Sequence, residues 1–228
     1  MKNNLNLIVM LTHNDKTVHN AAEIFEQCRN SKAKFWGMKE SPLPFQEMKK
    51  LFDGMKNCGK ITVLETVAYT EAECMKGAET AAACGCDILM GTKFFESVNA
   101  LCHEKRIKYM PFVGAVSGRP SILEGSVDSL IEEAKYCIKK GAYGIDLLGY
   151  RYTGNADELN RRFLSEIDAP VCIAGSINSF ERLDELKNVK PWGFTIGGAF
   201  FEKKFGDTFA RQIDSVCDYI ESVGERDV

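Results

Sequence analysis

The sequence predicts an α/β fold, a single (β/α)8 TIM barrel domain that spans residues 1–228. Short apolar runs alternate with longer amphipathic segments along the whole chain, and this alternation is typical of a parallel sheet. Eight strand–helix units in 228 residues match the lower end of the barrel size range. The turn after the first strand, Thr-His-Asn-Asp at 12–15, lacks the glycines of a doubly wound dinucleotide-binding sheet.

The first four units follow one another without a linker. Their strands are predicted at 5–12, 33–40, 60–67 and 86–92, and their helices at 16–31, 44–58, 71–85 and 94–106. In the first helix Val18, Ala22 and Phe25 recur at helical spacing. The second helix begins at Pro44 and is followed by Gly59, which are ordinary start and stop signals.

The last four units show the same alternation of strand and helix. Their strands are predicted at 107–116, 143–150, 169–176 and 192–200, and their helices at 126–141, 155–167, 179–188 and 205–223. Ser126 has the residue type of an N-cap and Gly141 that of a helix stop. No low-complexity segment or charge block divides the chain, so we expect one domain.

The composition is that of an ordinary soluble protein, with 45% hydrophobic and 27% charged residues. A net charge of −3 gives no reason to expect nucleic acid or an anionic membrane as partner. The apolar run near the N-terminus lacks the cleavage site of a signal peptide. We therefore expect a cytoplasmic protein, and the sequence leaves a homodimer open.

The nine cysteines are expected to be reduced and structural. No C-x-x-C pair occurs, and the spacing of Cys84 and Cys86 suits neither a zinc knuckle nor a redox pair. Cys137, Cys172 and Cys217 lie in apolar surroundings, where cysteine behaves as a small hydrophobic residue.

Two glycine turns follow the last two predicted strands. They are Gly175-Ser176-Ile177 and Gly197-Gly198-Ala199. In barrels the loops after strands seven and eight often form a phosphate site with the N-terminus of a short helix. Glycines let backbone N–H groups approach an anion, and Ser176 adds a hydroxyl donor. We therefore predict that Gly175, Ser176, Gly197 and Gly198 bind phosphate; the alternative is a pair of tight turns without a ligand.

The segment 169–201, with both turns, resembles the closing third of the ribulose-phosphate-binding barrels. That superfamily includes isomerases of histidine and tryptophan biosynthesis and N-acetylmannosamine-6-phosphate 2-epimerase, whose sixth and seventh units residues 141–177 also resemble. The resemblance implies a barrel enzyme that acts on a phosphorylated metabolite. Two positions depart from the epimerase pattern, which has an acid in place of Gly175 and an arginine near Phe200. The epimerase activity therefore does not follow from the resemblance.

Charged residues at strand ends are the candidate catalytic groups, because barrel active sites are built there. Glu65 and Asp146 lie inside predicted strands, and Lys39 and Lys93 follow two others. A buried carboxylate must be paired or stay protonated. We predict an acid–base set for proton transfer next to a carbonyl, as in an isomerase or epimerase, with Glu65 or Asp146 as the base and a lysine polarising the carbonyl. The alternative is an ion pair that only stabilises the barrel.

Two other functions stay open from the sequence. A lysine in apolar surroundings, Lys93 or else Lys39, has the properties of a Schiff-base amine in a lyase or aldolase. The second open alternative is a barrel that binds a phosphorylated metabolite without catalysis.

Three more residues are predicted to bind the substrate. His13 follows the first strand, Arg119 lies in the long loop 116–125, and Arg151 follows the sixth strand. No cluster of His, Asp and Glu has metal-ligand spacing. We therefore predict no metal site and no required cofactor, with Mg²⁺ on scattered carboxylates such as Glu65 and Asp146 left open.

Overall fold

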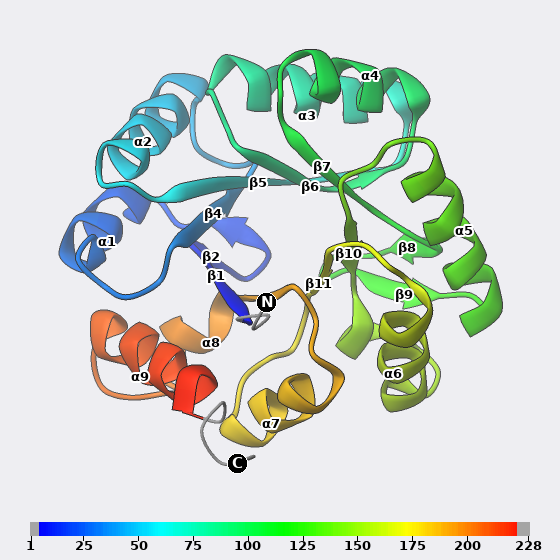
Figure 1. The fold of residues 1–228 in the computed structure, drawn as a ribbon. Helices are drawn as coiled ribbons and strands as arrows, with labels where there is room; N and C mark the ends of the chain where they lie inside the picture. Colours follow the sequence, from blue (N-terminus) through cyan, green and yellow to red (C-terminus); the bar gives the residue numbers. More distant parts are fainter. Residues whose placement is uncertain (1–4, 223–228) are drawn as a thin grey trace.

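The structure, a computed structural model, describes residues 5–222 and there forms a closed barrel of eight parallel strands (Figure 1). Around the barrel the strands are β1 (Asn6–Met10), β12 (Gly193–Ile196), β11 (Val171–Ile173), β10 (Ile145–Leu147), β7 (Lys108–Phe112), β6 (Ile88–Lys93), β5 (Ile61–Ala68) and β4 (Phe35–Lys39). β1 pairs with both β12 and β4, which closes the ring. The predicted (β/α)8 barrel is confirmed, while residues 1–4 and 223–228 of the predicted domain, with the last residue of its final helix, lie outside the described residues.

Helices cover the outside of this barrel (Figure 1). They are α1 (Ala21–Cys28), α2 (Phe45–Asn57), α3 (Glu71–Ala83), α4 (Glu96–Glu104), α5 (Val127–Lys139), α6 (Ala156–Glu166), α7 (Phe180–Val189), the short α8 (Gly198–Phe201) and α9 (Phe209–Glu221). The last helix, α9, packs beside α1. Within the described residues no helix is long and apolar enough to cross a membrane.

A small hairpin follows β1 where the sequence predicts the start of a helix. β2 (Thr12–His13) and β3 (Lys16–Thr17) pair in antiparallel fashion. The two-residue turn between them has Asn14 at φ 49° and Asp15 at φ 63°. Asn and Asp tolerate this left-handed region better than most residues, as tight hairpin turns require. The hairpin delays the first helix to Ala21 and places Asp15 at the barrel mouth.

A second hairpin replaces the predicted loop 116–125. β8 (Ala115–Ser117) and β9 (Ile122–Glu124) pair in antiparallel fashion, and the chain turns at Gly118 with φ 79°. The barrel strand β7 accordingly ends at Phe112 rather than at residue 116. The hairpin brings Pro120 and Ser121 to the barrel mouth.

The lower part of the barrel is filled by apolar side chains. They form one cluster inside the strands: Ile8, Met10, Phe35, Val63, Ile88, Met90, Met110 and Cys172. Trp192 packs at the edge of this cluster against Phe35, with ring centroids 5.3 Å apart. All nine cysteines are free thiols and all but Cys58 are buried. The packed floor leaves the upper end, where the strands terminate, as the place for a site.

Candidate active site

A pocket of about 320 Å³ opens at the carboxyl ends of the barrel strands. It is lined from both hairpins, from β4 and β5, and from the turns after β10, β11 and β12. The predicted site residues that line it are His13, Lys39, Glu65, Arg151, Gly175, Ser176, Gly197 and Gly198. Segments far apart in the sequence thus meet at one end of the barrel, as the argument from strand ends predicts.

Lys39 lies at the centre of an ion-pair network in this pocket. Its Nζ contacts Asp15 Oδ1 and lies 3.2 Å from Glu65 Oε1. All three side chains are largely buried, with 9% of Lys39, 11% of Asp15 and 14% of Glu65 exposed. A buried ion pair of this kind is retained only when its geometry and hydrogen bonds are good.

Backbone contacts fix the members of this network in place. The Lys39 N–H donates to Thr17 Oγ1, and Thr17 Oγ1 donates to the Lys39 carbonyl, both at 2.8 Å. These bonds join the first hairpin to the end of β4. Gly91, on neighbouring β6, leaves room for Glu65, because a Cβ there would lie 2.9 Å from Glu65 Cγ.

The network holds Lys39 as an ammonium ion. Burial alone would lower the pKa of Lys39, but the charges of Glu65 and Asp15 outweigh it and raise the pKa above its ordinary value. The positive charge is therefore present at the floor of the pocket throughout the neutral pH range. Such a charge stabilises negative charge that develops on a substrate oxygen.

Asp146 lies below this network and does not line the pocket. The residue is 1% exposed, and neither carboxyl oxygen has a hydrogen-bond partner among the described residues. Burial, followed by the charge of Glu65, raises the pKa of Asp146 well above its ordinary value, and Lys39 opposes this effect. Burial of this unpaired carboxyl group thus favours its protonated form.

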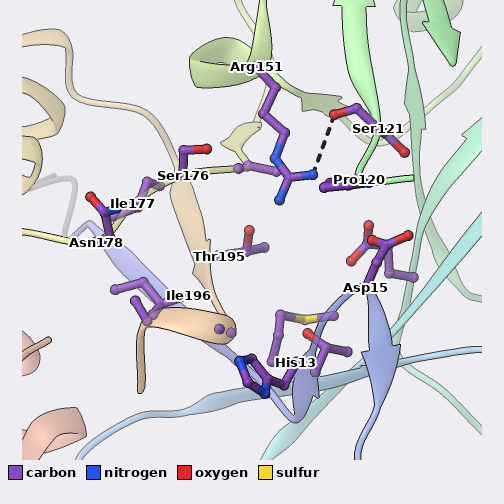
Figure 2. A pocket seen from close by; sticks show the side chains of 18 of the residues that line it. His13, Asp15, Pro120, Ser121, Arg151, Ser176, Ile177, Asn178, Thr195 and Ile196 are labelled. Atoms are coloured by element: carbon purple, nitrogen blue, oxygen red, sulfur yellow. Dashed lines mark hydrogen bonds between the residues drawn. The ribbon is translucent and has the colours of Figure 1, made fainter. Parts of the chain in front are cut away.

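The opposite side of the pocket carries the two glycine turns and Arg151. Arg151 comes from the 3-10 turn η1 (Gly149–Arg151) after β10 and extends into the pocket beside Ser176 (Figure 2). Its Nη1 donates to the Ser121 carbonyl at 3.4 Å, and no acidic partner of Arg151 lies among the described residues. A partly buried guanidinium without an acidic partner suits an anionic ligand.

Gly175 allows Arg151 to lie over the turn. Its φ is 87°, and a Cβ there would lie 2.7 Å from Arg151 Cγ. The neighbouring Ser176 also has a positive φ, of 53°. This unusual backbone turns the chain from β11 toward the pocket before α7 begins. Phosphate binding by the two turns stays a prediction.

Gly175→Ala is expected to lower the free energy of unfolding by about 1–3 kcal/mol, because it adds backbone strain and displaces Arg151. Denaturant unfolding measures this loss. Gly198→Ala is the matched control, since a Cβ at Gly198 meets nothing closer than His13 Cδ2 at 3.7 Å. Equal stability of the two variants would show that the turn tolerates a side chain under Arg151.

Lys93 and Arg119 are not part of the pocket wall. Lys93 ends β6 after a register shift between Met90 and Lys93, and its carbonyl accepts the Tyr109 hydroxyl at 2.8 Å. Arg119 lies at the rim, where Nη1 is 3.4 Å from Asp15 Oδ2 and Nη2 is 3.4 Å from Glu40 Oε1. Arg119 thus ties the second hairpin to the first and leaves its side chain 46% exposed.

His13 borders the turn after β12. Its ring stacks on Phe201, with centroids 5.2 Å apart and planes at 13°. His13 therefore has a packing partner as well as a position in the pocket wall. Among the described residues no group of three or more His, Cys, Asp or Glu is placed to hold a metal ion.

Sequence reasoning gave no role to several pocket residues. They are Asp15, Ser121, Asn178, Thr195 and Glu202. Asp15 carried the clearest signal, because Asn and Asp tolerate the positive φ that both central residues of a tight two-residue hairpin turn require. The others depend on how loops fold over the mouth, which periodicity does not predict.

Comparisons with known proteins find similarity to this chain only among solved structures. No protein-family model and no curated protein sequence matches it. A thiamine phosphate pyrophosphorylase from Pyrococcus furiosus is 17% identical, covers 97% of this chain and 98% of its own, and has a TM-score of 0.69. The tryptophan synthase alpha chain from Legionella pneumophila is 11% identical over 97% of this chain and 93% of its own, with a TM-score of 0.69.

An N-acetylmannosamine-6-phosphate 2-epimerase from Clostridium perfringens is also similar. It is 15% identical over 85% of this chain and 86% of its own, with a TM-score of 0.63. The barrel fold that the sequence resemblance implied is thus confirmed. At these identities the chain shares with all three proteins the (β/α)8 barrel fold.

Proposed function

We propose that the protein is an enzyme that moves a proton on the carbon next to the carbonyl group of a small phosphorylated metabolite, as an isomerase or epimerase does. Arg151 carries the proposal: its guanidinium, without an acidic partner in the described residues, faces the same pocket as the Lys39–Glu65 pair. The pocket would thus combine a side that binds an anion with a floor that carries out acid–base chemistry. Structural neighbours whose names contain phosphorylated compounds support the general kind of substrate.

The phosphate end of the substrate would lie between Arg151 and the two glycine turns. The first backbone N–H groups of α8, at Gly198 and Ala199, have no partner within their own helix and lie in the pocket wall. Gly197 and Gly198 add no side chain that would block an anion. Ser176 would contribute its hydroxyl. Arg151 would supply the positive charge that the epimerase pattern places near Phe200.

The reacting end would lie on Lys39 and Glu65. The Lys39 ammonium would polarise the carbonyl and stabilise the enediolate oxygen, while Glu65 would take the proton from the neighbouring carbon. Asp15 holds Lys39 from the other side, so the ammonium keeps its place when Glu65 becomes protonated. Lys39 supplies the positive charge of this proposal. Mg²⁺ on Glu65 and Asp146 and a homodimer stay open, and a cytoplasmic location stays a prediction.

Proton transfer fits Lys39 better than Schiff-base chemistry does. A Schiff base needs a neutral amine, whereas the carboxylates of Glu65 and Asp15 raise the pKa of Lys39 against the effect of burial. Lys93, the other candidate, does not line the pocket.

Incubation with pentose and hexose phosphates in D₂O, followed by proton NMR, tests the proposal. We expect loss of the signal of the hydrogen next to the carbonyl for one substrate, because deuterium replaces it. Borohydride trapping of a substrate on Lys39 or Lys93 would instead establish the lyase reaction. If a ligand stabilises the fold but neither deuterium exchange nor borohydride trapping is detected, the protein would bind the metabolite without catalysing a reaction.

A further inference from the structure

The second hairpin, formed by β8 and β9, contacts both ends of the pocket. The carbonyl of Ser121, near its tip, accepts a hydrogen bond from Arg151 Nη1 at 3.4 Å (Figure 2). Two residues earlier, Arg119 reaches Asp15 in the first hairpin. One short segment of the chain therefore joins the end of the pocket that carries Arg151 to the end that carries the ion-pair network.

The base of this hairpin is fixed on the Arg151 side by contacts that do not involve its tip. The Thr153 N–H donates to the Leu123 carbonyl at 3.0 Å, and Leu123 forms an isolated parallel bridge with Tyr152. The Tyr152 hydroxyl donates to the Gly125 carbonyl at 2.7 Å. The hairpin therefore has an attachment next to Arg151 that does not depend on what its tip binds.

At the tip, a single guanidinium group contacts three segments of the chain. Arg119 Nη1 donates to Asp15 Oδ2, and Nη2 donates to Glu40 Oε1 and to the Val67 carbonyl, each at 3.4 Å. These acceptors lie in the first hairpin, directly after β4 and in β5. The other oxygen of Asp15 contacts Lys39 Nζ. A chain of alternating charge thus runs from Arg119 at the rim, through Asp15, to Lys39 at the floor.

Little else fixes the Asp15 carboxylate. Its partners among the described residues are Lys39 and Arg119, one on each oxygen. Asp15 belongs to the turn of a hairpin whose strands have only two residues each. An exposed ion pair contributes little to stability, but the Asp15 side chain is 11% exposed, and this pair fixes its orientation. Without Arg119, one oxygen would lose its partner, and the carboxylate could rotate away from Lys39.

We propose that Arg119 is a positioning residue of the site: it holds Asp15 in place, and Asp15 in turn holds the Lys39 ammonium where the carbonyl of the substrate binds. Misplacement of a catalytic group by about 1 Å costs a factor of about 100 in rate, so a contact at the rim affects the reaction at the floor. Arg119 does not line the pocket and acts only through Asp15. This inference rests on the proposed role of Lys39.

The position of Lys39 is tested first without substrate, by ¹H–¹⁵N NMR of the lysine ammonium groups of the intact protein. Lys39→Met identifies the signal. In the wild type we expect the Lys39 ammonium protons to exchange slowly with water, because the group is nearly buried and contacts two carboxylates. In Arg119→Met this exchange should become at least about ten-fold faster, as the loss of one hydrogen bond to a charged group predicts.

Two further variants provide the control and test the route through Asp15. Arg162→Met is the matched control, because Arg162 also contacts two carboxylates and is 38% exposed, but joins α5 to α6 on the outside of the barrel. It should leave Lys39 exchange unchanged. Asp15→Asn weakens the link and keeps a residue type that tolerates the positive φ of this turn. In that background Arg119→Met should have little further effect, whereas independent contributions would add.

Kinetics with the substrate found in the deuterium-exchange screen provide a second measurement. Arg119→Met should lower kcat about ten- to one hundred-fold and change KM little, because Arg151 and the base of the hairpin keep their contacts. Arg119→Lys keeps the positive charge with fewer donors; it should restore part of the protection of Lys39, and it replaces the Met variant if that variant folds poorly.

The outcomes separate this inference from the proposed function. Unchanged Lys39 exchange in Arg119→Met, or an effect that persists undiminished in the Asp15→Asn background, would overturn it even if the enzyme turns over a sugar phosphate. Faster Lys39 exchange without proton exchange on any substrate would support the positioning of Lys39 and count against the proposed function. If Arg119 only stabilises the fold, its variants would unfold more easily, but Lys39 exchange in the folded protein would stay the same.

Discussion

Glu65→Gln is expected to slow the proposed proton transfer about 10²–10⁴-fold, which corresponds to about 3–5 kcal/mol of transition-state stabilisation. Glutamine has the same shape and keeps an oxygen toward Lys39, which lies 3.2 Å from Glu65 Oε1. The amide cannot accept a proton from carbon at neutral pH. The rate of deuterium exchange into the substrate found in the NMR screen measures the loss, and a denaturant unfolding curve shows that the fold is intact.

Glu40→Gln is the control for this substitution. Glu40 follows Lys39 in sequence, its carboxylate lies 3.4 Å from Arg119, and it does not line the pocket. The exchange rate should stay close to that of the wild type, because the Glu40 side chain pairs with Arg119 outside the pocket wall. An exchange rate in Glu65→Gln equal to that in Glu40→Gln would show that another group is the base.

The barrel follows from the sequence because each unit buries a short apolar strand under an amphipathic helix. That pattern is local and can be recognised in the amino-acid sequence. The strand predicted at 60–67, for example, is found as β5, Ile61–Ala68. The two hairpins were missed because β2 and β3 have two residues each and β8 and β9 three each. Strands of that length show no periodicity.

Part of the pocket lining could be predicted from the sequence for an equally physical reason. Strand ends of a parallel barrel meet at one end, so Lys39, Glu65, Arg151 and the glycine turns converge as expected. How far below the strand ends a side chain lies cannot be predicted from the sequence. Asp146 lies below the pocket, and the register shift that precedes Lys93 in β6 depends on a bulge that only the folded sheet reveals.

Arg151→Leu is expected to remove most of the stabilisation that a phosphate ligand gives the protein. A ligand present at about 100 times its Kd raises the free energy of unfolding by about 2.7 kcal/mol. Loss of charge-assisted hydrogen bonds from one guanidinium weakens binding by roughly 1.5–3 kcal/mol, so a Kd about 100-fold higher leaves only about 0.4 kcal/mol. Thermal unfolding with inorganic phosphate, sulfate and several sugar phosphates measures the difference.

Two further variants decide what such a loss means. Arg161→Leu removes an arginine on α6 that pairs with Asp157 and is 63% exposed, so its ligand-induced stabilisation should equal that of the wild type. Gly198→Asp places a carboxylate at the second turn, where a side chain has room, and should abolish the effect by repelling phosphate. Stabilisation that persists in Arg151→Leu and Gly198→Asp would place the anion elsewhere, and the two glycine turns would then serve only to connect strands to helices.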